Sequence, residues 1–149
     1  MILIKNSQRK VKINITQLKE DAQILLNALD YSDFDLGIWL CSDAMIRKYN
    51  KEYRHKDKVT DILSFPYHPS LKAGTRIKVK ADEDKNLGDI MIAPHYVEKD
   101  LPRWNQTFGK RMRVLLVHGI CHLLGYDHIT DADYKIMHKK EVALLHALK

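Results

Sequence analysis

The segment His118-Gly119-Ile120-Cys121-His122-Leu123-Leu124-Gly125-Tyr126-Asp127-His128 organises the rest of this 149-residue chain. His118 and His122 are four residues apart, so on a helix they share one face and can hold one metal ion. Gly125 permits the helix to end in a left-handed conformation, after which the chain can return His128 to the same ion. Three imidazoles leave a fourth position open, as in catalytic zinc sites, whereas structural sites carry four protein ligands.

Core packing is the alternative explanation for these histidines. One histidine on an apolar helix face is usually a core residue, and a pair at this spacing is a weak sign of a metal site. Three in the order H-x-x-x-H-x-x-G-x-x-H are hard to explain by packing. The sequence therefore predicts one Zn²⁺ per chain, bound by His118, His122 and His128.

The same order of residues occurs in metzincin proteases, with one difference. Those enzymes carry a glutamate directly after the first histidine, where it is the general base for the attacking water. Gly119 occupies that position here. A metallopeptidase-like hydrolase is therefore the weaker alternative, because its base is missing.

The histidine segment resembles the signature of the YbeY family, bacterial metal-dependent endoribonucleases of ribosomal RNA maturation. Two other stretches, Tyr53 to Pro66 and Leu87 to Ile92, also resemble that family, and all three occur in the family's order. The sequence departs at His55, where glycine is common, and at Val59, where proline is common. Neither residue is a predicted metal ligand, and the resemblance covers nearly the whole chain.

The resemblance implies a zinc-dependent endoribonuclease that is specific for single strands, with maturation of the 16S rRNA 3′ end and ribosome quality control as its tasks. It implies RNA, the small ribosomal subunit and its assembly factors as partners, and neither DNA nor a membrane. Arg54 matches the arginine of the family's tyrosine-arginine motif, and its bidentate fork suits a phosphate. Arg54 and His118 are thus the predicted catalytic residues, and Lys56 and Lys58 are candidates for steering the RNA backbone.

Two carboxylates are candidates for orienting the metal ligands. Glu141 lies within the apolar face of the last helix, where a carboxylate needs a partner. That partner is either the free ring N–H of a zinc-bound histidine or a basic residue at the edge of the face. Asp127 could orient a ligand or act as a base, but a turn-forming role is more common at such a position. The nucleophile is also open, since either zinc-bound water or the RNA 2′-hydroxyl can attack.

Composition agrees with a protein that binds an anionic partner. The net charge is +6, and basic residues cluster at 47–58, 72–80 and 110–113, which favours binding to a phosphate backbone.

No apolar run approaches the length of a membrane span, and the amino terminus lacks a signal-peptide pattern, so a cytoplasmic location is expected. The two cysteines form no disulfide framework, and Cys121 is expected to be a buried thiol. A non-catalytic ribosome-associated factor with structural zinc is the second alternative.

Hydrophobic periodicity predicts strands that alternate with helices. Strands are expected at 2–5, 11–15 (continuous with the first or separate), 35–41, 59–65 and 87–93, and 76–80 could form an edge ribbon within the polar segment 67–86. Helices are expected after Thr16 and Ser42, from Pro94 to Pro102, at 107–124 and after Thr130. The sequence thus predicts a single compact α+β domain, residues 1–149. Its small, mostly parallel sheet has about four strands and is flanked by helices around a central metal-binding helix.

Overall fold

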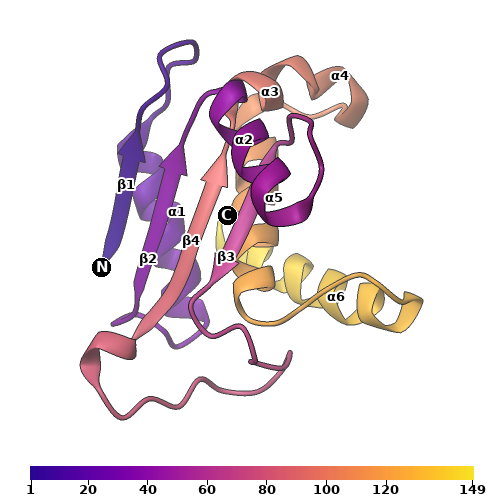
Figure 1. The fold of residues 1–149 in the computed structure, drawn as a ribbon. Coiled ribbons are helices and arrows are strands. Elements are labelled where there is room, and N and C mark those ends of the chain that lie inside the picture. Colours follow the sequence, from indigo (N-terminus) through magenta and orange to yellow (C-terminus); the bar gives the residue numbers. More distant parts are fainter.

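A four-stranded sheet lies at the centre of the molecule (Figure 1). The computed structural model describes residues 1–149, and its strands are β1 (Ile2–Asn6), β2 (Asp35–Leu40), β3 (Ile62–Pro66) and β4 (Asn86–Ile92). They lie in the order β1-β2-β4-β3, with β1, β2 and β4 parallel and β3 antiparallel to β4. The predicted α+β domain with a mostly parallel sheet is confirmed.

Six α-helices surround the sheet. They are α1 (Ile15–Ala28), α2 (Asp43–Arg54), α3 (Pro94–Lys99), α4 (Leu101–Trp104), α5 (Phe108–Leu123) and α6 (Asp131–Ala147), and a 3₁₀ turn, η1, spans Asp82–Asp84. Helices α1, α5 and α6 lie behind the sheet, whereas α2 lies in front of it (Figure 1). None of the helices combines the length and the apolar composition that crossing a bilayer requires.

The main core lies between the sheet and the helices behind it. Because side chains alternate between the two faces of a strand, β2 directs Leu36, Ile38 and Leu40 into this core, and all three are fully or almost fully buried. Helix α5 meets them with a broad apolar surface that includes Leu116 and Ile120. This packing fixes α5, and with it the two histidines of its last turns, against the sheet.

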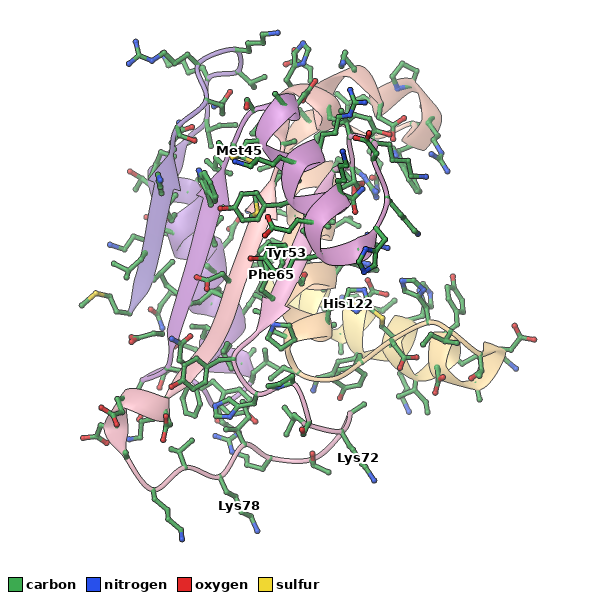
Figure 2. The ribbon with its side chains drawn as sticks, viewed as in Figure 1. Met45, Tyr53, Phe65, Lys72, Lys78 and His122 are labelled. Atoms are coloured by element: carbon green, nitrogen blue, oxygen red, sulfur yellow. The ribbon has the colours of Figure 1, made fainter.

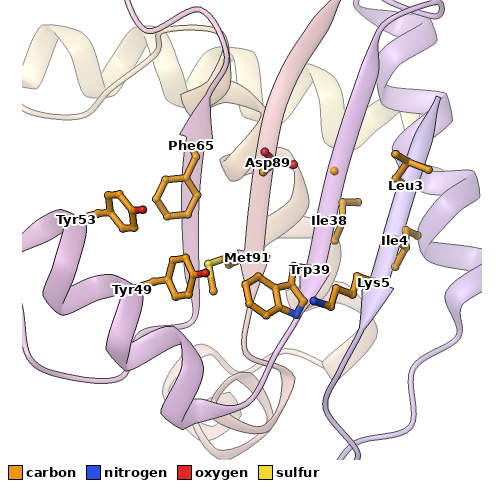
Figure 3. A pocket seen from close by; sticks show the side chains of 11 residues that line it. Leu3, Ile4, Lys5, Ile38, Trp39, Tyr49, Tyr53, Phe65, Asp89 and Met91 are labelled. Atoms are coloured by element: carbon orange, nitrogen blue, oxygen red, sulfur yellow. The ribbon is translucent and has the colours of Figure 1, made fainter.

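The front face of the sheet is covered only in part. Ile46 of α2 packs with Leu63 and Met91 in a second, smaller core. Beyond α2, a groove of about 630 Å³ stays open over β1, β2 and β4, with Trp39 and Lys5 along it (Figure 3). Helix α2 is therefore attached at one side of the front face, and its last residue is Arg54.

Several predicted boundaries are wrong, each for a local reason. Residues 11–15 form no strand, because the Gln8 side chain bonds both the N–H and the C=O of Val11 in place of a neighbouring strand. Asn14, not Thr16, caps α1 through its bond to the Gln17 N–H. Strand β3 begins at Ile62 instead of residue 59.

The segment that follows β3 also differs from the prediction. Residues 76–80 form no ribbon, because the Ile77 N–H donates to the Tyr31 hydroxyl and Arg76 donates to the Leu29 carbonyl. Lys72 and Lys78 point outward from this segment (Figure 2). Pro102 does not end α3; it lies in the first turn of α4, a position at which its missing N–H costs little.

Candidate metal centre

Helix α5 and the turn after it deliver three histidines to one place. Thr107 caps the start of α5 by accepting from the Lys110 N–H, and the helix ends at Leu123. Gly125 then has a φ of +90°, and a Cβ there would meet the carbonyl oxygen of Leu71. This turn, which favours glycine, brings His128 back towards the helix.

The three imidazoles are close enough to share an ion. One ring nitrogen from each of His118, His122 and His128 lies within 4.8 Å of the other two. The Nε2 atoms of His118 and His122 are 3.0 Å apart. Nitrogens bound tetrahedrally to zinc at about 2.0–2.1 Å lie roughly 3.3 Å from one another. The three side chains could therefore hold a metal ion with little movement.

Hydrogen bonds orient two of the rings. The Nδ1 atom of His118 lies 3.0 Å from Oε2 of Glu141, and Nδ1 of His122 lies 3.0 Å from the Tyr126 carbonyl oxygen. Because each acceptor requires a proton on Nδ1, each Nε2 keeps its lone pair for an ion. The structure thus places Glu141 beside a predicted ligand rather than beside a basic residue. Figure 2 shows His122 projecting from α5.

Electrostatics keep His122 neutral. Burial, followed by the neighbouring charges of His118 and His128, lowers the pKa of His122 to about 4. A neutral imidazole is the form that binds metal. Burial would raise the pKa of Glu141, but the hydrogen bond and charge of His118 outweigh it and hold this pKa below its ordinary value. Glu141 is therefore a carboxylate that can accept a hydrogen bond from the His118 Nδ1–H.

Arg54 and the three histidines line one hollow of about 380 Å³, here called the Arg54 hollow. Arg54 is exposed at the carboxyl end of α2, and Ser64 of β3 lines the opposite part of the wall. Lys56 and Lys58 do not line the hollow; they are exposed in the segment that follows α2. A phosphate placed beside the histidines would thus have Arg54 within the same cavity.

Three other residues of the motifs have structural roles. His55 ends α2 with a φ of 59°, the left-handed conformation at which glycine is common. Asp127 accepts a hydrogen bond from the Ile129 N–H across the turn that carries His128. Cys121 is a buried, free thiol whose pKa burial raises to about 12, and a protonated thiol is a poor metal ligand.

The structure adds contacts that the sequence did not indicate. Arg111 and Arg113 belong to a basic cluster, yet they pair with Asp61 and Asp21 respectively. These two arginines therefore hold the fold together, and the cluster at 110–113 is not a continuous surface for RNA. Tyr134 of α6, whose spacing from Met137 and Glu141 places it on the same side of the helix, is 55% exposed. No spacing rule separates such residues from their neighbours, because their partners are distant in sequence.

Gly119, the residue at the peptidase base position, faces the sheet. A Cβ on Gly119 would lie 2.9 Å from the Cδ1 atoms of both Ile62 and Ile90. This distance is shorter than ordinary van der Waals contact, so helix and sheet meet here only because the side chain is missing. A glutamate at this position would require the ends of Ile62 and Ile90 to move and would begin between helix and sheet.

Comparison with known proteins identifies the family of the chain. The family model described as "Endoribonuclease YbeY" matches residues 3–149. A protein named Endoribonuclease YbeY from Homo sapiens is 36% identical, over 99% of this chain and 87% of the human protein. One of the same name from Desulforamulus reducens is 33% identical, over 99% of this chain and 96% of that protein. The solution structure of TM1509 from Thermotoga maritima superposes with a TM-score of 0.64 at 26% identity, over 99% of this chain and 89% of the other. The chain belongs to the YbeY endoribonuclease family.

Proposed function

We propose that this protein is a zinc-dependent endoribonuclease that cuts single-stranded RNA during ribosomal RNA processing. The observation that carries the proposal is the convergence of three imidazole nitrogens within 4.8 Å, in a hollow that Arg54 also lines. Family membership supplies the reaction class, since the matching proteins are named endoribonucleases. Such enzymes are hydrolases that act on phosphodiester bonds.

The chemistry divides between the ion and the side chains. A zinc ion held by His118, His122 and His128 supplies Lewis acidity and lowers the pKa of bound water to about 7. Glu141 keeps the His118 ring in the orientation and tautomer that binding requires. Arg54 can place its guanidinium against the phosphate and offset the negative charge that grows in the transition state.

The biological setting follows from the family. We place the protein on the small ribosomal subunit in the cytoplasm, with ribosomal RNA as substrate and assembly factors as partners. Maturation of the 16S rRNA 3′ end and ribosome quality control are the tasks that this placement favours. Lys56 and Lys58, both exposed beyond the end of α2, would attract the RNA backbone through charge rather than through a fixed contact.

Gly119 disfavours the peptidase alternative. A glutamate at this position would have to displace Ile62 and Ile90 and would then face the sheet. A non-catalytic RNA-binding factor with structural zinc stays the other alternative. A single-stranded RNA and a casein-like protein, each incubated with zinc-loaded enzyme, separate all three functions. Cleavage of RNA alone supports the proposal, whereas cleavage of casein or of neither substrate overturns it.

Zinc content and chelation test the metal directly. We expect about one zinc per chain in the wild type, its loss in His118→Ala, His122→Ala and His128→Ala, and its retention in His146→Ala, which lies outside the cluster. A chelator should abolish RNA cleavage, and added zinc should restore it. Full zinc content in the His122→Ala variant would remove this residue from the ligand set.

Arg54 has a separate test. Arg54→Ala should keep the zinc and the fold but lose RNA cleavage by about 100-fold or more, as expected when a donor to transition-state charge is removed. Arg47→Ala is the matched control, because Arg47 lies on the same helix and its partner is the exposed Asp57. Equal cleavage rates in the two variants would exclude Arg54 from catalysis.

A further inference from the structure

A second hollow adjoins the histidine cluster on the side away from Arg54. It has a volume of about 530 Å³ and shares His118, His128 and Asp61 with the Arg54 hollow. We call it the Trp104 hollow. Its size falls within the range of small-ligand sites. Because the two hollows meet at the histidines, an RNA strand that crosses the candidate metal centre can place nucleotides in both.

Exposed aromatic rings line the Trp104 hollow. Trp104 comes from α4 and is 39% exposed, whereas Tyr134 comes from α6 and is 55% exposed. Each residue thus leaves a large part of its surface open to solvent while the rest packs against the fold. Both are nevertheless held in place by neighbours, so the structure presents two oriented rings to solvent.

The neighbours of Trp104 fix its plane. Its Nε1–H donates to Asp100 across 2.9 Å, and the guanidinium carbon of Arg111 lies 3.7 Å from the ring centroid. The guanidinium carbon of Arg103 lies 5.1 Å from the same centroid. Arg111 is buried and paired with Asp61, whereas Arg103 is exposed. Arg103 is therefore the cation beside the indole that an approaching phosphate would favour.

Tyr134 has a comparable arrangement on the opposite wall. Its ring lies parallel to that of His138, with an interplanar angle of 7° and a centroid separation of 5.7 Å. Each carboxylate that lines the hollow already has a hydrogen-bond partner: Asp61 with Arg111, Asp100 with Trp104, and Glu141 with His118. The hollow therefore contains aromatic faces and cationic groups, while its acids are occupied.

We propose that the Trp104 hollow binds a nucleobase of the RNA strand next to the scissile phosphate, by stacking on Trp104 or Tyr134. The inference rests on the proposed function and names where one flank of the substrate lies. Stacking on aromatic side chains accepts any base and suits single strands, whose bases are unpaired. A rigid duplex keeps its bases stacked within itself, so the hollow also accounts for a preference for single strands.

The open groove on the front of the sheet is the other place where bases could stack, since Trp39, Tyr49, Tyr53 and Phe65 line it (Figure 3). Two features favour the Trp104 hollow. It directly adjoins the histidines, and the one acid of the front groove, Asp89, is exposed and has no side-chain hydrogen-bond partner, whereas each acid of the Trp104 hollow has one. An unpaired carboxylate repels a phosphate backbone.

The two tryptophans of the chain make the proposal testable by fluorescence. The Trp39→Phe variant keeps Trp104 as its one indole, and the Trp104→Phe variant keeps Trp39 as its one indole. Zinc-loaded protein is mixed rapidly with a short oligouridylate, and the fluorescence change is read before cleavage. We expect quenching in Trp39→Phe and none in Trp104→Phe. The opposite result would place the RNA on the front groove and would overturn the proposal.

Kinetics supply a second, independent test. Tyr134→Ala should raise KM for single-stranded RNA about tenfold with little change in kcat, as expected for one lost base stack. Tyr134→Phe should restore KM, because the ring is what stacks. Tyr67→Ala is the control, an exposed ring outside the hollow. Unchanged KM in Tyr134→Ala together with unquenched Trp104 would remove the subsite.

The same experiments separate this inference from the proposed function. Cleavage of RNA without any effect of Trp104 or Tyr134 leaves the enzyme assignment intact and removes the subsite. Quenching of Trp104 by RNA that the zinc-loaded protein never cuts leaves the subsite intact and removes the enzyme assignment.

Discussion

At the scale of single residues, the absence of a side chain at Gly119 is as informative as the three histidines. Helix α5 approaches β3 and β4 so closely that a Cβ would lie 2.9 Å from Ile62 and Ile90. The close packing brings His118, the preceding residue, against the β3 side of the molecule, where Arg54 and Ser64 also lie. Gly119, which stands at the peptidase base position, thus also helps to bring the elements that line the Arg54 hollow together.

Gly119→Glu tests this point. The variant recreates the peptidase pattern, but it places a carboxylate between helix and sheet. We expect its free energy of unfolding to fall by about 3 kcal/mol or more, because a charged group without a partner enters the core, and we expect no peptidase activity. Gly109→Glu is the matched control in the first turn of the same helix, where a Cβ meets nothing within 4 Å. Denaturant unfolding of both variants gives the comparison, and equal stabilities would contradict the packing argument.

The sequence predicts the position of a site residue where the spacing within one short segment determines that position. The spacing of His118, His122 and His128 predicts a shared site because helix geometry and one glycine turn place them together. Glu141 could be singled out because it interrupts an apolar face, but the sequence left two kinds of partner open, a histidine ligand or a basic residue. The exposure of Tyr134 could not be predicted either, since it depends on a hollow formed by α4, α5 and α6 together.

At the scale of elements, α2 determines where Arg54 lies. Its start is fixed by Ser42, which accepts from the Met45 N–H, and by Asp43, which bonds His95 and Lys99 of α3. The serine cap follows from local sequence. The link from Asp43 to α3 cannot be predicted from local sequence, because the two partners of Asp43 lie about fifty residues away in the chain.

The link between α2 and α3 predicts a pH dependence of stability. Burial would raise the pKa of Asp43, but hydrogen bonds from His95 and Lys99 outweigh it and hold the pKa below its ordinary value of 3.8. A depressed carboxyl pKa stabilises the fold above pH 3.8 and loses this contribution as the pH falls through the folded-state value. Asp43→Asn should therefore be less stable than the wild type near neutral pH, and the difference should shrink below pH 3.8.

Chemical denaturation between pH 2.5 and 7 measures this dependence. Glu52→Gln is the control, since Glu52 is exposed on the same helix. A difference between Asp43→Asn and the wild type that stays constant over the whole range would show that Asp43 contributes through packing alone.

At the scale of the whole molecule, the sequence predicts the layers better than the connections between them. Alternation along β2 and the 3.6-residue period of α1 and α5 are set by the burial of one face, so the sheet and its covering helices could be predicted. The failures at 11–15 and 76–80 arise where backbone groups of Val11 and Ile77 bond to the side chains of Gln8 and Tyr31 instead of to a strand. Such hydrogen bonds depend on which side chains lie beside the backbone in the folded protein, and the hydrophobic periodicity of the sequence does not predict them.

The metal centre joins parts of the molecule that the sheet does not. His118 and His122 lie on α5, His128 follows the Gly125 turn, and Glu141 lies on α6. An ion at this point therefore ties the last two helices and their connection into one unit. Because a metal that binds the folded state stabilises it by mass action, the stability of the molecule should depend on zinc.

The expected size of this effect follows from linkage. Free zinc at 100 times its dissociation constant stabilises the fold by about 2.7 kcal/mol, which corresponds to a rise in Tm of roughly 5–10 °C for a chain of this length. Calorimetry with zinc and with chelator measures the shift. His128→Ala should have the same Tm in both conditions, whereas His146→Ala should keep the wild-type difference. A wild type that binds zinc but has the same Tm with and without it would contradict this prediction. In that case packing alone holds the last two helices together, and the metal centre contributes to the reaction but not to stability.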